Sequence, residues 1–153
     1  MLAGSGEVID TMSVVVNQYL DNLAARVLLG LAGNPGGWSI HLYVNLYAPT
    51  PQDTVSSYVE CTLPGYSFVT FQSSQWSGGI SPGPIAVYTY PQITWTFDPY
   101  QSAQQTVFGY WVQDSSGSVL YAELFPAPFP VPPQGGELPM RPTFSTEQCP
   151  AQL

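Results

Sequence analysis

The sequence predicts a mainly β protein, an antiparallel β-sandwich or jelly-roll-like domain with one N-terminal amphipathic helix and proline-rich extended arms. Several short segments carry apolar residues at every second position, and clusters of Gly, Pro and Ser separate them. Only one segment has helical spacing, and it precedes all of the others. Short strands between turn signals are typical of antiparallel sandwiches and barrels, and 153 residues suit one domain with its own core.

The segment from Glu7 to about Leu29 is the predicted helix. Its apolar residues follow the spacing i, i+3, i+4, i+7 and so form one stripe. Arg26 lies in the last turns, where a cation interacts favourably with the helix dipole, and the Gly-rich residues 30–37 end the helix. The β-branched run Val14–Val16 opposes helix formation, so we expect tertiary packing to supply most of the stability.

The strands are expected after this helix. From Ile40 to Tyr47 the period changes to two, which predicts a half-buried strand with His41 on its polar face. The tetrapeptide 114–117 suits a hairpin turn with Gly117 at positive φ, and 73–84 reads as a loop. Further strands are predicted at Tyr66–Phe71, Ile85–Tyr90, Ile93–Phe97, Thr106–Gln113, Ser118–Phe125 and, interrupted by prolines, Leu138–Ser145.

Three parts follow from this order of elements. Residues 1–37 form a helical segment with a Gly-rich linker, 38–145 a β-sandwich domain, and 146–153 a C-terminal tail. Within the domain, residues 126–133 are expected to form an extended, polyproline-like arm, because proline cannot enter a central strand.

Composition excludes several function classes. The net charge is −8, with two arginines and no lysine, so the chain cannot replace the counterions of a nucleic acid or bind an anionic membrane surface. One histidine and two cysteines cannot make a common zinc site, and no two acidic residues lie close enough in sequence for a calcium loop. We expect no metal, no cofactor, no nucleic acid and no membrane partner.

The residues suited to catalysis are few. His41 is the only ordinary general base, but no G-x-S-x-G motif accompanies it, so we interpret it as a strand residue with a hydrogen-bond partner. Paired carboxylates could catalyse glycoside hydrolysis, and the candidates are Glu60, Asp98, Asp114, Glu123 and Glu137. These residues are scattered along the chain, as charged residues on a protein surface usually are. We therefore expect no catalytic residues and no enzyme activity.

The aromatic residues divide into core and contact candidates. Trp95 shares a strand face with Phe97, and Trp111 shares one with Val107, so both tryptophans are expected in the core. Trp76 lies in a loop and is expected at a contact surface, where aromatic side chains are enriched.

The proline-rich arm is the second expected contact surface. Proline segments are already extended and lose little conformational entropy when they dock. The expected protein-contact residues are Trp76, Pro126, Pro128, Phe129, Pro130 and Pro132, together with the helix stripe. Cys61 and Cys149 are either a disulfide that ties the tail to the domain or two free thiols.

Over about residues 38–145 the chain resembles small virion proteins of tailed bacteriophages. The likeness is carried by these stretches in order: Leu42–Asn45, Leu63–Tyr66 before Trp76, Tyr90–Pro91, Thr94–Phe97, Val107–Gly117, Val119–Phe125, Val131–Leu138 and Arg141–Phe144. The resemblance implies a capsid-associated structural protein with no catalytic residues to carry over.

From this resemblance we expect a decoration (cement) protein that bridges major capsid protein subunits on the phage head. Its partners would be the major capsid protein and neighbouring copies of itself, as a homo-oligomer or a lattice-associated protein. It would lie on the capsid surface of the virion, after assembly in the host cytoplasm. Two alternatives stay open: a tail or neck adaptor or fibre-base protein, and a carbohydrate-binding module with exposed coplanar aromatics.

Overall fold

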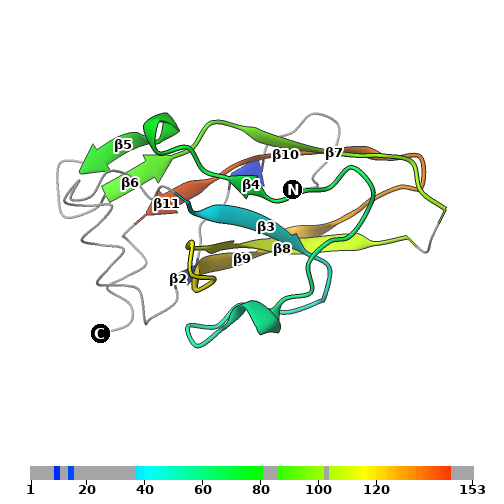
Figure 1. Cartoon of the computed structure of the whole chain (residues 1–153), viewed down its shortest axis with the longest axis horizontal. Helices are drawn as coiled ribbons and strands as arrows, with labels where there is room; N and C mark the ends of the chain where they lie inside the picture. The colour runs from blue at the N-terminus through cyan, green and yellow to red at the C-terminus, as the bar shows by residue number, and fades with distance from the viewer. Residues whose placement is uncertain (1–8, 11–13, 16–36, 81–85, 102–103, 146–153) are drawn as a thin grey trace.

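The computed structural model describes residues 9–10, 14–15, 37–80, 86–101 and 104–145, and these residues are mainly β (Figure 1). The strands are β1 (Ile9–Asp10), β2 (Val14–Val15), β3 (Ser39–Tyr43), β4 (Val69–Thr70), β5 (Ser77–Ile80), β6 (Ala86–Thr89), β7 (Ile93–Phe97), β8 (Thr106–Gln113), β9 (Val119–Pro130), β10 (Gly136–Arg141) and β11 (Thr143–Ser145). Two short 3₁₀ helices, η3 (Val55–Ser57) and η4 (Ser73–Gln75), complete the described elements. Within these ranges no helix has the length and apolar character needed to cross a membrane.

The largest sheet has five strands in the order β2-β9-β8-β3-β4, and every pairing in it is antiparallel. Its centre is the β8–β9 hairpin. Gly117 has a φ of 86° in the turn, and the Asp114 carboxylate accepts hydrogen bonds from the backbone N–H groups of Ser116 and Ser118. The predicted hairpin with Gly117 at positive φ is confirmed.

Two three-stranded sheets accompany it, β1-β10-β7 and β11-β6-β5. All of their pairings are antiparallel except that of β1 with β10. Figure 1 shows β7 and β10 running along one side of the molecule and β3, β8 and β9 along the other. The mainly β, antiparallel class predicted from the sequence is confirmed.

The main core gathers side chains from both of these sides. Strand β7 buries every second residue, Ile93, Trp95 and Phe97, as an alternating strand does. These side chains belong to one cluster with the other large buried residues, among them Ile40, Leu42, Tyr110, Val112, Phe125, Leu138 and Met140. The core position predicted for Trp95 is confirmed.

The N-terminal helix predicted from Glu7 to Leu29 is not confirmed. In the two parts of this segment that the structure describes, Ile9–Asp10 pairs with β10 and Val14–Val15 pairs with β9, so both parts are short strands. In general, β-branched residues favour a pleated sheet and lose side-chain freedom in a helix. The remaining positions of the predicted helix lie outside the described residues.

The prediction that the strand ends at Phe125 and an arm follows is wrong, because β9 continues to Pro130. The N–H of Val131 donates to Gln105 O, which precedes β8, at 3.0 Å. Alternate residues of a strand direct their N–H to the same side, so the nitrogens of Pro128 and Pro130 face away from β8. The ladder to β8 therefore loses no donor to these prolines.

Two further predictions are corrected. The predicted loop 73–84 contains strand β5, which pairs with β6 from Ser77↔Thr89 to Ile80↔Ala86. Trp111 does not share a face with Val107, because the β8–β9 register shifts between Val107 and Gly109. That irregularity reverses the alternation: Val107 lies in the main core, whereas Trp111 is buried as predicted but in a second cluster on the opposite face of the sheet.

Candidate functional site

The outer face of the five-stranded sheet, away from the main core, carries the most unusual chemistry among the described residues. The sequence predicted a polar, half-buried face at His41, yet His41 is 5% exposed and Tyr43 is fully buried. The chain after β3 covers this face, since Tyr47, Val55 and Tyr58 pack there. We call the buried residues the outer cluster: Tyr43, Tyr58, Trp111, Val119 and Ala122.

Backbone contacts hold the covering segment against β3. The N–H of Val44 donates to Val59 O at 2.8 Å, and the N–H of Cys61 donates to Leu42 O at 2.9 Å. The Asn45 side chain donates to Ser57 O and accepts from the N–H of Val59. Residues 59–61 therefore pair along the edge of β3, and the preceding side chains of Tyr47, Val55 and Tyr58 remove the polar face from water.

Four rings stack in a continuous row across this face. His41 lies between Phe68 and Trp111, with centroid distances of 4.7 Å on both sides and interplanar angles of 26° and 13°. Tyr58 continues the row on the far side of Trp111, at 5.2 Å and 9°. Both faces of the imidazole are thus covered, and only its edge remains for polar contacts.

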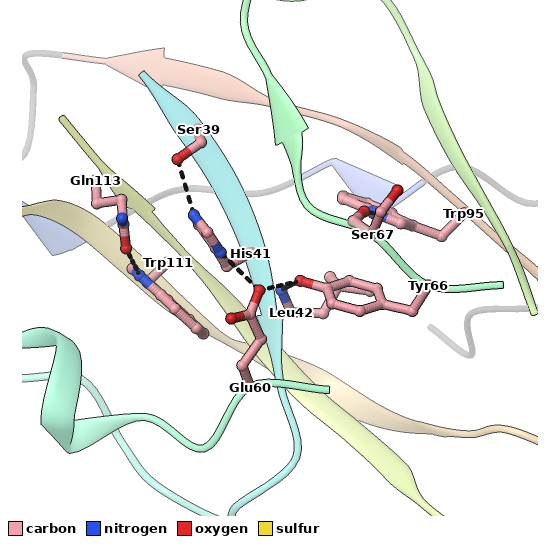
Figure 2. A network of polar contacts seen from close by, with 9 residues as sticks. All are labelled: Ser39, His41, Leu42, Glu60, Tyr66, Ser67, Trp95, Trp111 and Gln113. Carbon is pink, nitrogen blue, oxygen red and sulfur yellow. Dashed lines mark hydrogen bonds and ion pairs between the residues drawn. The ribbon is translucent and has the colours of Figure 1, made fainter. Parts of the chain in front are cut away.

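The edge of His41 joins two side chains, as Figure 2 shows. Its Nε2 lies 2.8 Å from Ser39 Oγ, and its Nδ1 lies 2.7 Å from Glu60 Oε1. Tyr66 donates its hydroxyl to the same Glu60 oxygen at 2.9 Å and accepts the N–H of Leu42 at 3.0 Å. The chain Ser39–His41–Glu60–Tyr66 therefore ties β3 to the residues before β4.

Ser39, His41 and Glu60 are hydrogen-bonded in the same order as the nucleophile, the general base and the orienting acid of a catalytic triad. Ser39 is only 8% exposed, and burial of His41 lowers its pKa even though Glu60 opposes that shift through its hydrogen bond and charge. A neutral imidazole can accept a proton from a hydroxyl. The same low exposure leaves little room for a substrate at Ser39 Oγ.

Asp53 is a buried carboxylate that the sequence reading missed. It accepts hydrogen bonds from the hydroxyls of Tyr58 at 2.5 Å, Tyr47 at 2.6 Å and Thr50 at 2.7 Å, and from the N–H of Thr50. Burial raises the pKa of Asp53, but these hydrogen bonds outweigh that effect and bring the pKa below its ordinary value. The Thr-x-x-Asp spacing before a tyrosine was the available signal, and it is a weak one.

Burial and the neighbouring carboxylates also act on the tyrosines of this region. Burial raises the pKa of Tyr58, and its hydrogen bond to Asp53 adds to the shift. Burial likewise raises the pKa of Tyr66, beside Glu60, and of Tyr43. These phenols stay protonated at neutral pH and act as hydrogen-bond donors.

Large apolar side chains are exposed beside this covered face. Leu46 is 77% exposed, Val59 is 56% exposed and Phe68 is 52% exposed, and we call these three the outer patch. Leu46 and Val59 both flank the Asn45 contact, and Phe68 is the end ring of the stack on His41. The sequence reading did not single out any of the three.

The structure disperses the contact residues predicted from the sequence. Trp76 is half-buried against Phe71 and Tyr90, and within the described residues its buried indole N–H has no hydrogen-bond partner. Phe129 is buried in the core and stacks on Phe97 at 6.3 Å. Pro126, Pro128 and Pro130 are exposed on β9, and Pro132 is half-buried after it.

The candidate carboxylates are also dispersed. Glu60 belongs to the His41 network, and Asp114 belongs to the hairpin turn. Tyr110 donates to Glu123 at 3.4 Å, while Asp98 and Glu137 are exposed. In the described ranges, no three His, Cys, Asp or Glu residues come together as a metal site would require. Cys61 is a buried free thiol, and Cys149 lies outside the described residues.

The fold and this face define a mainly antiparallel β domain with one sheet covered on both sides. No protein-family model, no curated protein and no solved structure matches the chain.

Proposed function

We propose that the chain is a structural virion protein of a tailed bacteriophage, and more narrowly a decoration protein that bridges major capsid protein subunits on the head. The resemblance over residues 38–145 supports the phage assignment. The residues of the outer patch support action through contact, because large exposed side chains fixed on a rigid surface are typical of protein interfaces.

The observation that carries the proposal is the way in which the Phe68 ring is held. Its ring is half-exposed, while one face rests on the buried row of His41, Trp111 and Tyr58. A side chain held in this way loses little rotamer freedom when a partner covers it. The Asn45 contacts hold the covering segment at Ser57 and Val59, and the Glu60 contact holds its end against His41.

We further propose that the sheet of β7 and β10 and the sheet of β3, β8 and β9 form a β-sandwich. The single cluster of buried side chains from both sheets supports this arrangement. On the side of the five-stranded sheet, the surface available to other subunits is then formed by the covering segment and the outer patch. Many modest contacts on a repeating lattice add up through effective concentration.

The first experiment measures the copy number of this protein in purified particles, by quantitative mass spectrometry against the major capsid protein. A ratio near that of the capsid protein supports head decoration. A few copies per particle would move the protein to the neck or tail. Absence from particles would overturn the virion assignment and favour the carbohydrate-binding alternative, which a glycan array would then test.

A binding experiment then separates the two candidate surfaces. Particles assembled without the protein are incubated with the wild type, with a variant carrying Leu46→Ser, Val59→Ser and Phe68→Ser, and with a variant carrying Pro126→Ala, Pro128→Ala and Pro130→Ala. We expect the outer-patch variant to bind at least about tenfold more weakly. A loss confined to the proline variant would place the contact on β9 instead.

A serine hydrolase is the second candidate, favoured by the Ser39–His41–Glu60 hydrogen-bond order. A fluorophosphonate probe tests it directly, because the probe forms a covalent bond with an activated serine hydroxyl. Labelling of the wild type that disappears in Ser39→Ala would establish an activated nucleophile. Equal labelling of the two proteins removes this candidate and leaves the hydrogen-bonded chain with a structural role.

A further inference from the structure

We propose that Glu60 and Phe68 form a docking site for an arginine side chain of the partner protein, set among the apolar contacts of the outer patch. This inference deepens the proposed function and rests on it for the identity of the partner. The site itself is defined by residues of this chain alone.

Phe68 and Glu60 are both held against the same side chain, His41. Phe68 covers one face of the His41 ring at a centroid distance of 4.7 Å, and Glu60 binds the edge of the same ring at 2.7 Å. A ring and a carboxylate are thus fixed next to one imidazole. Figure 2 shows the Glu60 carboxylate between His41 and the Tyr66 hydroxyl.

The Glu60 carboxylate has unused capacity for hydrogen bonds. Glu60 Oε1 receives the hydrogen bonds of both His41 and Tyr66, and within the described residues no hydrogen bond to Oε2 is found. The Glu60 side chain is 39% exposed, so a partner can approach it. A carboxylate oxygen that is oriented through its neighbour is preorganised for a donor.

Charge also favours a cationic partner. The described part of the chain places no arginine against Glu60, and burial holds the pKa of His41 below its ordinary value, so the imidazole is neutral at pH 7 and leaves the carboxylate uncompensated. The whole chain has a net charge of −8 and lacks lysine. A cationic partner is therefore complementary to the local site and to the molecule.

The two groups together distinguish arginine from other cations. A planar guanidinium can stack on the exposed side of an aromatic ring and donate to a carboxylate with the same group. The site presents both kinds of group, since the Phe68 ring is half-exposed and the Glu60 side chain is 39% exposed. A lysine ammonium would satisfy the charge without the stacking.

The test uses the full chain and a small probe, N-acetyl-arginine amide, followed by NMR. Its neutral isostere, N-acetyl-citrulline amide, is the matched ligand control. We expect the arginine probe to shift the resonances of Phe68 and His41, and the citrulline probe to leave them in place. Equal shifts with both probes, or none with either, would overturn the site.

Variants locate the effect. Glu60→Gln keeps an oxygen for His41 and Tyr66 but removes the charge, and we expect it to weaken arginine binding about threefold to fivefold. Glu137→Gln removes the same charge from an exposed position on β10 and should leave binding unchanged. Equal losses in the two variants would show a general charge effect and contradict the site.

The probe experiment does not depend on virions. Arginine binding at Glu60 together with absence of the protein from particles would uphold the site and overturn the proposed function. Presence on particles with unchanged binding by Glu60→Gln and Phe68→Leu would uphold the function and overturn the site.

Discussion

The imidazole of His41 lies face to face with the indole of Trp111, with ring centroids 4.7 Å apart and planes inclined by 13°. The two residues are direct register partners on β3 and β8. Their stacking therefore follows from the pairing of neighbouring strands, and the covering segment closes over rings that the sheet has already aligned. This relation makes the outer cluster as dependent on strand register as the main core is.

Acidification should reduce stability through the ordinary histidine range. The folded chain lowers the pKa of His41 below 6.5, because burial disfavours the charged ring. The unfolded chain therefore takes up a proton before the folded chain does, and the free energy of unfolding falls as the pH drops from about 7, levelling only below the folded pKa. Urea unfolding at stepped pH measures this slope. A slope of the same size in His41→Gln would contradict the assignment.

Replacement of Asp53 should loosen the covering segment. In Asp53→Asn one end of the side chain becomes an NH2 group that cannot accept, so two of the four donors from Tyr47, Tyr58 and Thr50 lose their acceptor and the other two lose its charge. We expect a loss of about 2 kcal/mol in the free energy of unfolding, measured by chemical denaturation. Asp98→Asn, at an exposed position, is the matched control and should change stability by less than about 0.5 kcal/mol.

Gly109→Ala and Gly117→Ala should lower the free energy of unfolding by different amounts, because each glycine is required for a different reason. A Cβ at Gly109 would overlap Glu123 O and lie 2.5 Å from Tyr43 Oη, so Gly109→Ala forces the β8–β9 pair apart. We expect a loss of about 3 kcal/mol or more. Gly117 has nothing within 4 Å of the same position but a φ of +86°, so Gly117→Ala should cost only about 1 kcal/mol. Chemical denaturation of both variants measures the difference, and equal losses would contradict the close approach at Gly109.

Substitutions at Phe129 and Pro128 should differ in their effect on the free energy of unfolding, because one side chain is buried and the other lies on the surface. Phe129 is buried against Phe97, and we expect Phe129→Ala to lower the free energy of unfolding by about 3 to 5 kcal/mol. Pro128 is exposed, so Pro128→Ala should change it by about 0.5 kcal/mol or less. Thermal and chemical denaturation of both variants check this contrast. A small effect at Phe129 would show that the end of β9 is not part of the core.

The sequence predicts best where local patterns decide the structure. The β8–β9 hairpin combines period-two strands with a turn of fixed chemistry, and β7 alternates as its residues predict. Both depend on neighbours within a few residues. The class of fold follows from several such segments together.

The candidate site could not be predicted because it depends on contacts distant in sequence. His41 reads as a residue on a polar face, and only the return of Tyr58 and Glu60 across the sheet buries it. The register shift before Gly109 reverses which side of β8 Trp111 occupies, and no periodicity reveals such a shift. Asp53 differs, because its partners Tyr47, Thr50 and Tyr58 lie within six residues of it, and the local spacing alone does not show that they converge on one carboxylate.

The two prolines near the end of β9 have a consequence for how copies of the molecule meet. Because the nitrogens of Pro128 and Pro130 face away from β8, that border offers carbonyl oxygens but lacks N–H donors at these positions. An incoming chain finds no complete template along this border, so the addition of a strand there is disfavoured. Copies crowded against this border at high local concentration therefore meet there through their side chains and not through an added strand.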